Sequence, residues 1–252
     1  MSGHSKWSSI KHKKAATDAK RGKLFTKLAR AIQVSAREGG GDVESNASLA
    51  LAVQKAKDAS MPKDNIERAI AKGTGADQDG QAFETMLYEG YGPAGVAILV
   101  EGLTDNRNRT GSEVRHLFSR GGGSLGEPGS VAWLFEKKGE IAVDATRYDE
   151  EDLMVAIEAG AQDITLDGDV LEVVTEPEDF TAVRDALTGA GVELDSAELA
   201  QRPSTRAPVD ESDAGTLLRL IEGLEDHDDV QAVHANFEMD AKVLERAAGA
   251  AG

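Results

Sequence analysis

The end of the chain most constrains the fold, because it supplies only one helix and one strand. A proline-flanked linker, QRPSTRAPVD, spans residues 201–210. After this linker, the apolar spacing predicts a helix over 213–224 and a strand over 230–239. A single helix and a single strand cannot bury their apolar faces alone. They must therefore complete a domain that begins earlier in the chain.

The segment from 83 to 138 has the patterning of the other half of that domain. Its apolar residues predict strands over 87–91 and 96–104, followed by a helix over 110–120. After a Gly-rich loop, the pattern predicts a buried strand over 131–135. This β-α-β half lacks one helix and one strand, which the C-terminal pair can provide.

The residues between these two halves form a self-contained alternating unit. Strands are expected over 141–143, 164–166, 170–174 and 192–199, and helices over 150–159 and 177–187. This β-α-β-β-α-β order is that of a ferredoxin-like sandwich. We expect a discontinuous α/β domain over 83–138 plus 210–240, with a ferredoxin-like α/β domain inserted over 139–205. The Ala-rich residues after Asp240 predict a loosely packed tail.

The N-terminus is basic, whereas the chain as a whole is acidic. The first 37 residues carry ten Lys or Arg and one Asp, although the formal net charge of the chain is −17. Such a separation of charge indicates a polyanionic partner, either nucleic acid or an anionic surface. The alternative is a solvated basic tail. Helical patterning can distinguish such a tail from a folded surface that binds a polyanion.

Residues 15–37 have the periodicity of an amphipathic helix. Leu24, Phe25, Leu28 and Ile32 recur on one face. The opposite face carries Lys20, Lys23, Lys27, Arg30 and Arg37. Further helices over 46–59 and 62–73 complete a basic helical domain over residues 1–76. The expected fold class is therefore α+β and multidomain: an N-terminal three-helix domain followed by two α/β sandwich domains, one ferredoxin-like and inserted into the other.

Two groups of residues are candidates for nucleic-acid contact besides the helix face. The first is a flexible arm in which an aromatic ring lies among cations, namely Lys6, Trp7, Lys11, Lys13 and Lys14. Cations suit phosphate contacts and Trp7 suits base stacking, although Trp7 could instead anchor the arm to the helical domain. The second group, a possible second patch, is Arg107, Arg109, Arg115 and Arg120. Its alternative is structural salt bridges to Glu101, Asp105 or Glu113.

The sequence gives no support for catalysis, a metal or a cofactor. The chain contains no cysteine, and its five histidines lack metal-ligand spacing. Residues 226–229, Asp-His-Asp-Asp, are interpreted as a solvated acidic turn. Gly121–Gly126 matches a dinucleotide fingerprint and a hydrolase elbow by letter, but a helix precedes this segment and a strand follows it. We expect no catalytic residue, no cofactor and no small-molecule substrate.

Five segments together resemble the YebC/PmpR family. They are GHSKWSSIKHKKAATDAKRGKLFTKLARAI, MPKDNIERAI, YEGYGPAGVA, TDNRNRT and GGSLGEPGSVAWLF. The resemblance spans nearly the whole chain and implies a three-domain cytoplasmic protein. Members are generally labelled DNA-binding transcriptional regulators. Other members, including a mitochondrial relative that activates translation, are linked to the ribosome.

These observations predict a non-enzymatic regulator of gene expression that binds nucleic acid. A DNA-binding transcriptional regulator on promoter DNA is the first interpretation. A ribosome-associated translation factor that binds ribosomal RNA is the alternative. No stretch approaches 18 consecutive apolar residues, so we expect no membrane partner, and we place the protein in the cytoplasm.

Overall fold

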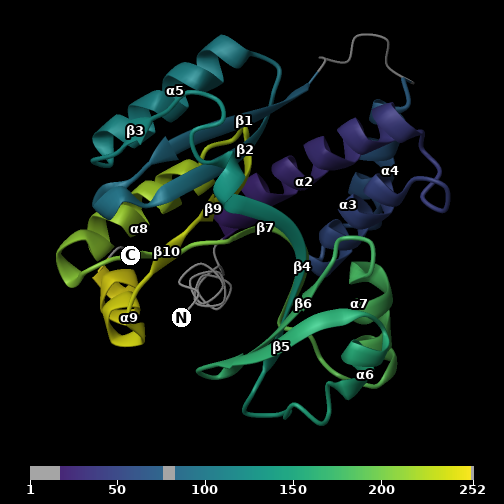
Figure 1. Ribbon diagram of the computed structural model, residues 1–252. Coiled ribbons are helices and arrows are strands. Elements are labelled where there is room, and N and C mark those ends of the chain that lie inside the picture. Colours follow the sequence, from purple (N-terminus) through teal and green to yellow (C-terminus); the bar gives the residue numbers. More distant parts are fainter. Residues whose placement is uncertain (1–17, 76–82, 251–252) are drawn as a thin grey trace.

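The computed structural model describes residues 18–75 and 83–250 (Figure 1). Its first part is a bundle of α2 (Asp18–Gly39), α3 (Ala47–Asp58) and α4 (Lys63–Gly73). Asn46 joins two of these helices, because its side chain caps α3 by accepting from Leu49 N and donates to Ser35 O near the end of α2. The core of this helical domain contains Ile32, Ala36, Leu49, Val53, Ala56, Met61, Ile66 and Ala69.

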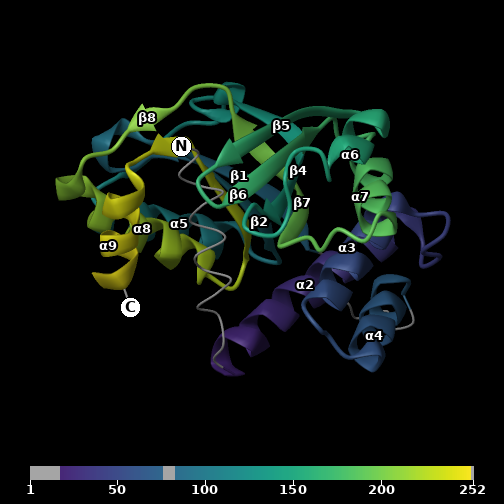
Figure 2. The same cartoon turned by 90° about the horizontal axis from the view of Figure 1, so that it is seen from below.

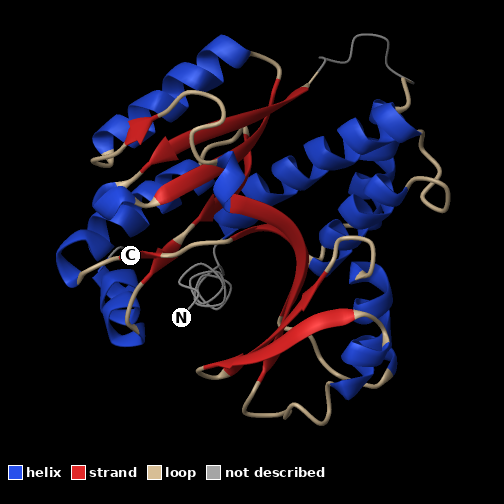
Figure 3. Ribbon diagram, viewed as in Figure 1, coloured by secondary structure: helices blue, strands red, loops and turns tan. Residues whose placement is uncertain are grey.

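A first antiparallel sheet combines strands from both ends of the remaining chain. Its strands are β1 (Glu84–Tyr91), β2 (Ala97–Thr104), β3 (Ser124–Leu125) and β9 (Val230–Ala235), in the order β3-β1-β2-β9. Helices α5 (Arg107–Arg120) and α8 (Glu211–Glu225) cover one face of this sheet and share its apolar core (Figure 3). The C-terminal helix and strand therefore complete a domain whose sheet begins more than 100 residues earlier, as expected for a helix and strand that cannot bury their apolar faces alone.

A second antiparallel sheet forms the ferredoxin-like unit. Its strands are β4 (Phe135–Asp144), β5 (Ala161–Asp167), β6 (Val170–Thr175) and β7 (Ser196–Pro203), in the order β5-β6-β4-β7. Helices α6 (Met154–Glu158) and α7 (Phe180–Gly189) pack on one face. The predicted fold class is confirmed. The domain boundaries stay a prediction, and β4 runs without interruption across residue 138.

The strand expected over 131–135 is wrong. Residues 132–134 form a 3₁₀ turn, η2 (Ala132–Leu134), and Phe135 already belongs to β4 of the second sheet. The buried carboxylate of Glu89 accepts hydrogen bonds from the backbone N–H groups of Gly129, Val131 and Ala132 at 2.6–2.7 Å. Two of these groups would be needed in a strand ladder, so the Glu89 side chain outweighs the strand propensity of the apolar run.

The expected strand over 230–239 is interrupted, and the expected loose tail is wrong. Asn236 interrupts the strand, because the Asn236 side-chain oxygen accepts from Ala97 N at 2.8 Å. Asn236 thus separates β9 from β10 (Phe237–Glu238), and β10 pairs with β8 (Ala207–Pro208). The chain then forms α9 (Ala241–Ala250), which lies beside α8 (Figure 2). Leu244 of α9 is 1% exposed in the core under α8.

A 3₁₀ turn, η1 (Pro93–Gly95), connects β1 to β2 at the predicted Gly-Pro-Ala-Gly turn. Ala94 and Gly95 both have positive φ there, which suits a tight reversal. None of the described helices combines the length and the apolar character needed to span a bilayer.

Candidate functional site

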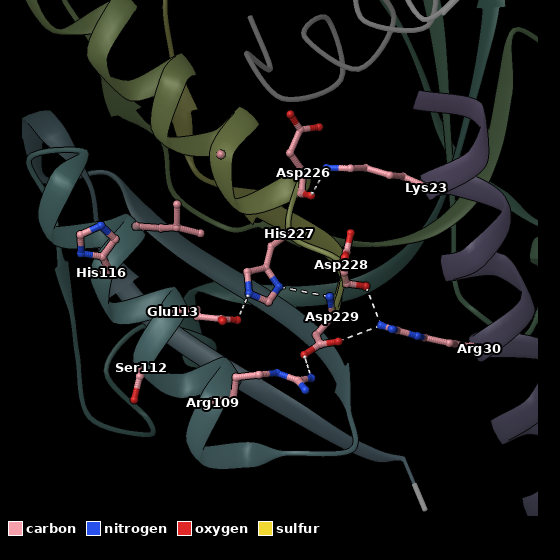
Figure 4. A pocket seen from close by; sticks show the side chains of 12 residues that line it. Lys23, Arg30, Arg109, Ser112, Glu113, His116, Asp226, His227, Asp228 and Asp229 are labelled. Carbon is pink, nitrogen blue, oxygen red and sulfur yellow. Dashed lines mark hydrogen bonds and ion pairs between the residues drawn. The ribbon is translucent and has the colours of Figure 1, made fainter. Parts of the chain in front are cut away.

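The cationic face of α2 lies against the turn between α8 and β9. We call this contact the clasp; it is formed by Lys23, Lys27 and Arg30 of α2, Arg109 of α5, and residues 225–229. Figure 4 shows Lys23 and Arg30 reaching this turn from one side and Arg109 from the other. The clasp therefore joins the helical domain to the first α/β sheet.

Three cations of α2 bind backbone carbonyls at the end of α8 and in the turn that follows it. Lys23 Nζ donates to Asp226 O at 3.3 Å, Lys27 Nζ donates to Glu225 O, and Arg30 Nη1 donates to Asp228 O at 2.8 Å. The last carbonyls of a helix have no partner within the helix and carry a partial negative charge. The face predicted to bind phosphates thus places Lys23 and Lys27 at the negative C-terminus of α8.

Asp229 is the centre of the clasp, and its side chain is 3% exposed. Its Oδ1 accepts from Arg30 Nη1 at 2.8 Å. Its Oδ2 accepts from Arg109 Nη2 at 2.7 Å, from Thr110 Oγ1 at 2.7 Å and from Thr104 Oγ1 at 3.2 Å. Both carboxylate oxygens are therefore bound, and one charge is shared between arginines of two domains.

The environment of Asp229 strongly favours its ionised form. Burial alone would raise the pKa of this carboxyl, but the hydrogen bonds from Thr110, Arg109 and Arg30 and the positive charge of Arg109 outweigh burial. Together they lower the pKa of Asp229 from 3.8 to about 2. Asp229 is therefore ionised at neutral pH.

His227 orients the turn that carries Asp229. Its Nδ1 accepts from Asp229 N at 3.1 Å, and its Nε2 lies 2.8 Å from Glu113 Oε2. Because Nδ1 accepts a hydrogen bond, Nε2 carries the ring proton and donates a hydrogen bond to Glu113. Leu103 N also donates to Asp229 O at 2.7 Å, so β2 holds the same turn.

An open cavity of about 730 Å³ lies between α2, α5 and this turn. Its lining includes His116 and, with charges of both signs, Lys23, Arg30, Arg109, Glu113, Asp226, Asp228 and Asp229 (Figure 4). The deeply buried carboxylate among them, Asp229, already accepts from Arg30, Arg109, Thr110 and Thr104, and the His227–Glu113 pair lines the same cavity. Among the residues that the structure describes, no group of three or more His, Cys, Asp or Glu could hold a metal ion.

The structure places the predicted helix face in two parts. Lys23, Lys27 and Arg30 meet in the clasp, whereas Arg37 is exposed in the last turn of α2. Lys20 also belongs to α2. The arm residues Lys6, Trp7, Lys11, Lys13 and Lys14 lie outside the described residues.

The four arginines of the possible second patch do not converge. All belong to α5, which begins at Arg107 with Asn106 as its cap, three residues before the expected start. Arg107 lies 3.6 Å from Glu84, and Arg109 binds Asp105 and Asp229. Arg115 and Arg120 are exposed at positions about 140° apart around the helix.

Sequence reasoning missed the central residue, Asp229. The prediction that residues 226–229 are solvated is wrong for Asp229, although Asp226 and Asp228 are exposed. One signal was available, because Asp229 directly precedes the buried Val230 and its backbone enters the sheet. The pairing with Arg30 had no local signal, since 199 residues separate the two.

The geometry defines a multidomain α+β protein in which a basic helical domain is held by charge against two α/β units. Residues 5–76 match the profile of the TACO1/YebC protein N-terminal domain, and residues 83–237 match that of the TACO1/YebC second and third domain. The chain therefore belongs to the TACO1/YebC family, and the predicted resemblance is confirmed.

Relatives over the full length carry a regulatory name. The chain is 58% identical to a probable transcriptional regulatory protein of Rubrobacter xylanophilus, over 99% of this chain and 100% of the relative. It is 54% identical to a protein of the same name from Acidothermus cellulolyticus, over 97% and 99%. The crystal structure of a conserved hypothetical protein, Aq1575 of Aquifex aeolicus, matches with a TM-score of 0.80 and 46% identity, over 90% of this chain and 94% of the other.

Proposed function

We propose that this protein is a non-enzymatic regulator of gene expression that binds nucleic acid, acting in the cytoplasm as a DNA-binding transcriptional regulator. The observation that carries the proposal is the concentration of ten Lys or Arg in the first 37 residues of a chain with a net charge of −17. Relatives named probable transcriptional regulatory proteins support the same class of function.

The cations of α2 and of the N-terminal arm would contact phosphates. Lys20, Lys23, Lys27, Arg30 and Arg37 supply the helix face, and Lys6, Lys11, Lys13 and Lys14 supply the arm. The acidic remainder of the chain repels phosphate, so binding is restricted to the basic side and the protein is oriented on its target. Trp7 would add stacking on a base or sugar.

The salt dependence of binding tests this proposal. Each phosphate contact that is lost should make the slope of log K against log salt shallower by about 0.7 to 0.9. We expect this change for Lys23→Gln, measured by fluorescence anisotropy with a labelled 30-base-pair duplex of mixed sequence. Lys137→Gln, at an exposed position of β4, is the matched control and should leave the slope unchanged. An identical slope for both variants would contradict a role for the helix face.

Crosslinking in cells, followed by sequencing of the bound nucleic acid, separates the two targets. Enrichment of promoter DNA supports the transcriptional regulator. Enrichment of ribosomal RNA, with co-sedimentation on ribosomes, would replace it by the ribosome-associated translation factor. Equal binding to all duplexes at physiological salt would also count against sequence-directed transcriptional control.

A further inference from the structure

We propose that the clasp is an autoinhibitory contact, in which the α8–β9 turn and the phosphates of a nucleic acid compete for the same cations of α2. This inference rests on the proposed function. It adds that nucleic-acid binding separates the helical domain from α5 and from the turn. In the closed protein, the α8–β9 turn occupies the cations of α2 in place of a phosphate backbone.

The acceptor oxygens of the turn and those of a phosphate would bind the same donor atoms of α2. Arg30 Nη1 donates both to Asp228 O and to Asp229 Oδ1, each at 2.8 Å, and the Arg30 side chain is only 21% exposed. Lys27 Nζ is bound to Glu225 O. A phosphate oxygen cannot occupy these directions while the turn does, so full engagement of the predicted helix face requires the clasp to open.

Among the residues that the structure describes, mostly polar contacts hold the helical domain against the rest of the chain. Its core contains only its own residues, and the core shared by α5 and α8 includes none from residues 18–75. Arg30 also lies over the Phe83 ring at 5.4 Å, and, outside the clasp, Lys55 lies 3.2 Å from Glu198. Leu51 packs at the edge of the ferredoxin-like core. Domains joined by small polar interfaces move relative to one another.

A nucleic acid has the charge density to displace the turn. The turn offers the α8 carbonyls and three carboxylates, Asp226, Asp228 and Asp229. Duplex DNA presents one negative charge per about 1.7 Å and releases counterions when it is bound. Opening has its own free-energy cost, so the apparent affinity of the closed protein is reduced by the fraction of molecules that are open.

Energy transfer between two labels measures the opening directly. The chain has no cysteine, so Lys72→Cys in α4 and Ser119→Cys in α5 place single labels at exposed positions of the two parts. The probes are a 30-base-pair DNA duplex of mixed sequence and a single-stranded RNA of the same sequence. We expect the transfer efficiency to fall as either probe saturates the protein.

Asp229→Asn weakens the clasp and should increase affinity for the same probes. Asp228→Asn removes the same charge from the same turn, but its carboxylate lies at an exposed position, so it corrects for the change in net charge. We expect Asp229→Asn to bind at least about threefold more tightly than Asp228→Asn and to show lower transfer efficiency without any probe. Thr110→Val, which removes a donor to Asp229 and leaves every charge in place, should shift both quantities in the same direction.

The outcomes separate this inference from the proposed function. Binding with unchanged transfer efficiency would overturn the competition and leave nucleic-acid binding intact. Equal affinities of Asp229→Asn, Thr110→Val and Asp228→Asn, with folded proteins shown by circular dichroism, would do the same. Absence of binding to both probes by every protein would remove both proposals.

Discussion

Glu89 and Asp229 are both buried carboxylates, yet they bind different kinds of partner. Asp229 faces two arginines and two hydroxyls, so it joins side chains from distant segments. Glu89 accepts from the backbone N–H groups of Gly129 and Val131, before η2, and of Ala132, its first residue. Burial would raise the pKa of Glu89, but these bonds lower it below 4.5. One carboxylate holds two domains together, and the other fixes the shape of a loop.

The stability contributed by Asp229 should depend on pH. Its pKa is about 2 in the folded chain against an ordinary value of 3.8, so its contribution is present above about pH 4 and is lost as the pH falls towards 2. We expect wild type to lose about 2 kcal/mol more than Asp229→Asn between pH 5 and pH 2, measured by urea unfolding. The Asp228→Asn protein should follow wild type, and parallel curves for all three proteins would contradict the assignment.

Replacing Glu89 by Gln should loosen the loop before η2. A Gln amide has one acceptor oxygen where the carboxylate has two, so its NH2 group replaces one acceptor and leaves at least one of the three bound N–H groups unsatisfied. We expect a loss of about 2 to 3 kcal/mol in the free energy of unfolding and faster hydrogen exchange at Val131 and Ala132. The control is Glu127→Gln, at an exposed position of the same loop. Equal exchange in both variants would show that Glu89 does not fix the loop.

At the scale of elements, periodicity predicts most helices and strands. The exceptions occur where a side chain from a distant segment accepts hydrogen bonds from the backbone. The ferredoxin-like order follows from the alternation of strands and helices along 139–205, although only β5 and β6 are both consecutive strands and paired, and β4 pairs with β6 and β7. The apolar run at 131–135 has strand propensity, but Glu89, about 40 residues earlier, binds its backbone. Such long-range hydrogen bonds leave no periodic pattern, which is why the loop and the clasp partner Asp229 were not predictable.

Helix α9 should contribute to the core despite its Ala-rich composition. Leu244→Ala removes a side chain that is 1% exposed beneath α8, and we expect it to destabilise the chain by roughly 2 to 4 kcal/mol in chemical denaturation. Lys242→Ala, at an exposed position of the same helix, is the control. A loss below about 0.5 kcal/mol for Leu244→Ala would restore the interpretation of residues after 240 as a loose tail.

At the scale of the whole molecule, separate cores predict separate unfolding. The helical domain has its own apolar cluster and is held to the remainder mainly by charged and polar contacts. We expect amide protons of α3 and α4 to exchange through an opening of lower free energy than those of β2 and β9, measured by native-state hydrogen exchange in low denaturant. A single opening free energy shared by all four elements would show that the clasp couples the domains fully.

The continuous strand β4 has a consequence for engineering the chain. The polypeptide enters the ferredoxin-like unit at Phe135 and leaves it at Pro203, and these two residues are partners in the β4–β7 ladder. Cα atoms of antiparallel partners lie about 5 Å apart, a gap that a short turn can bridge. The residues between Phe135 and Pro203 could therefore be replaced by a tight turn. This deletion would shorten the protein while leaving β1, β2 and β9 in register.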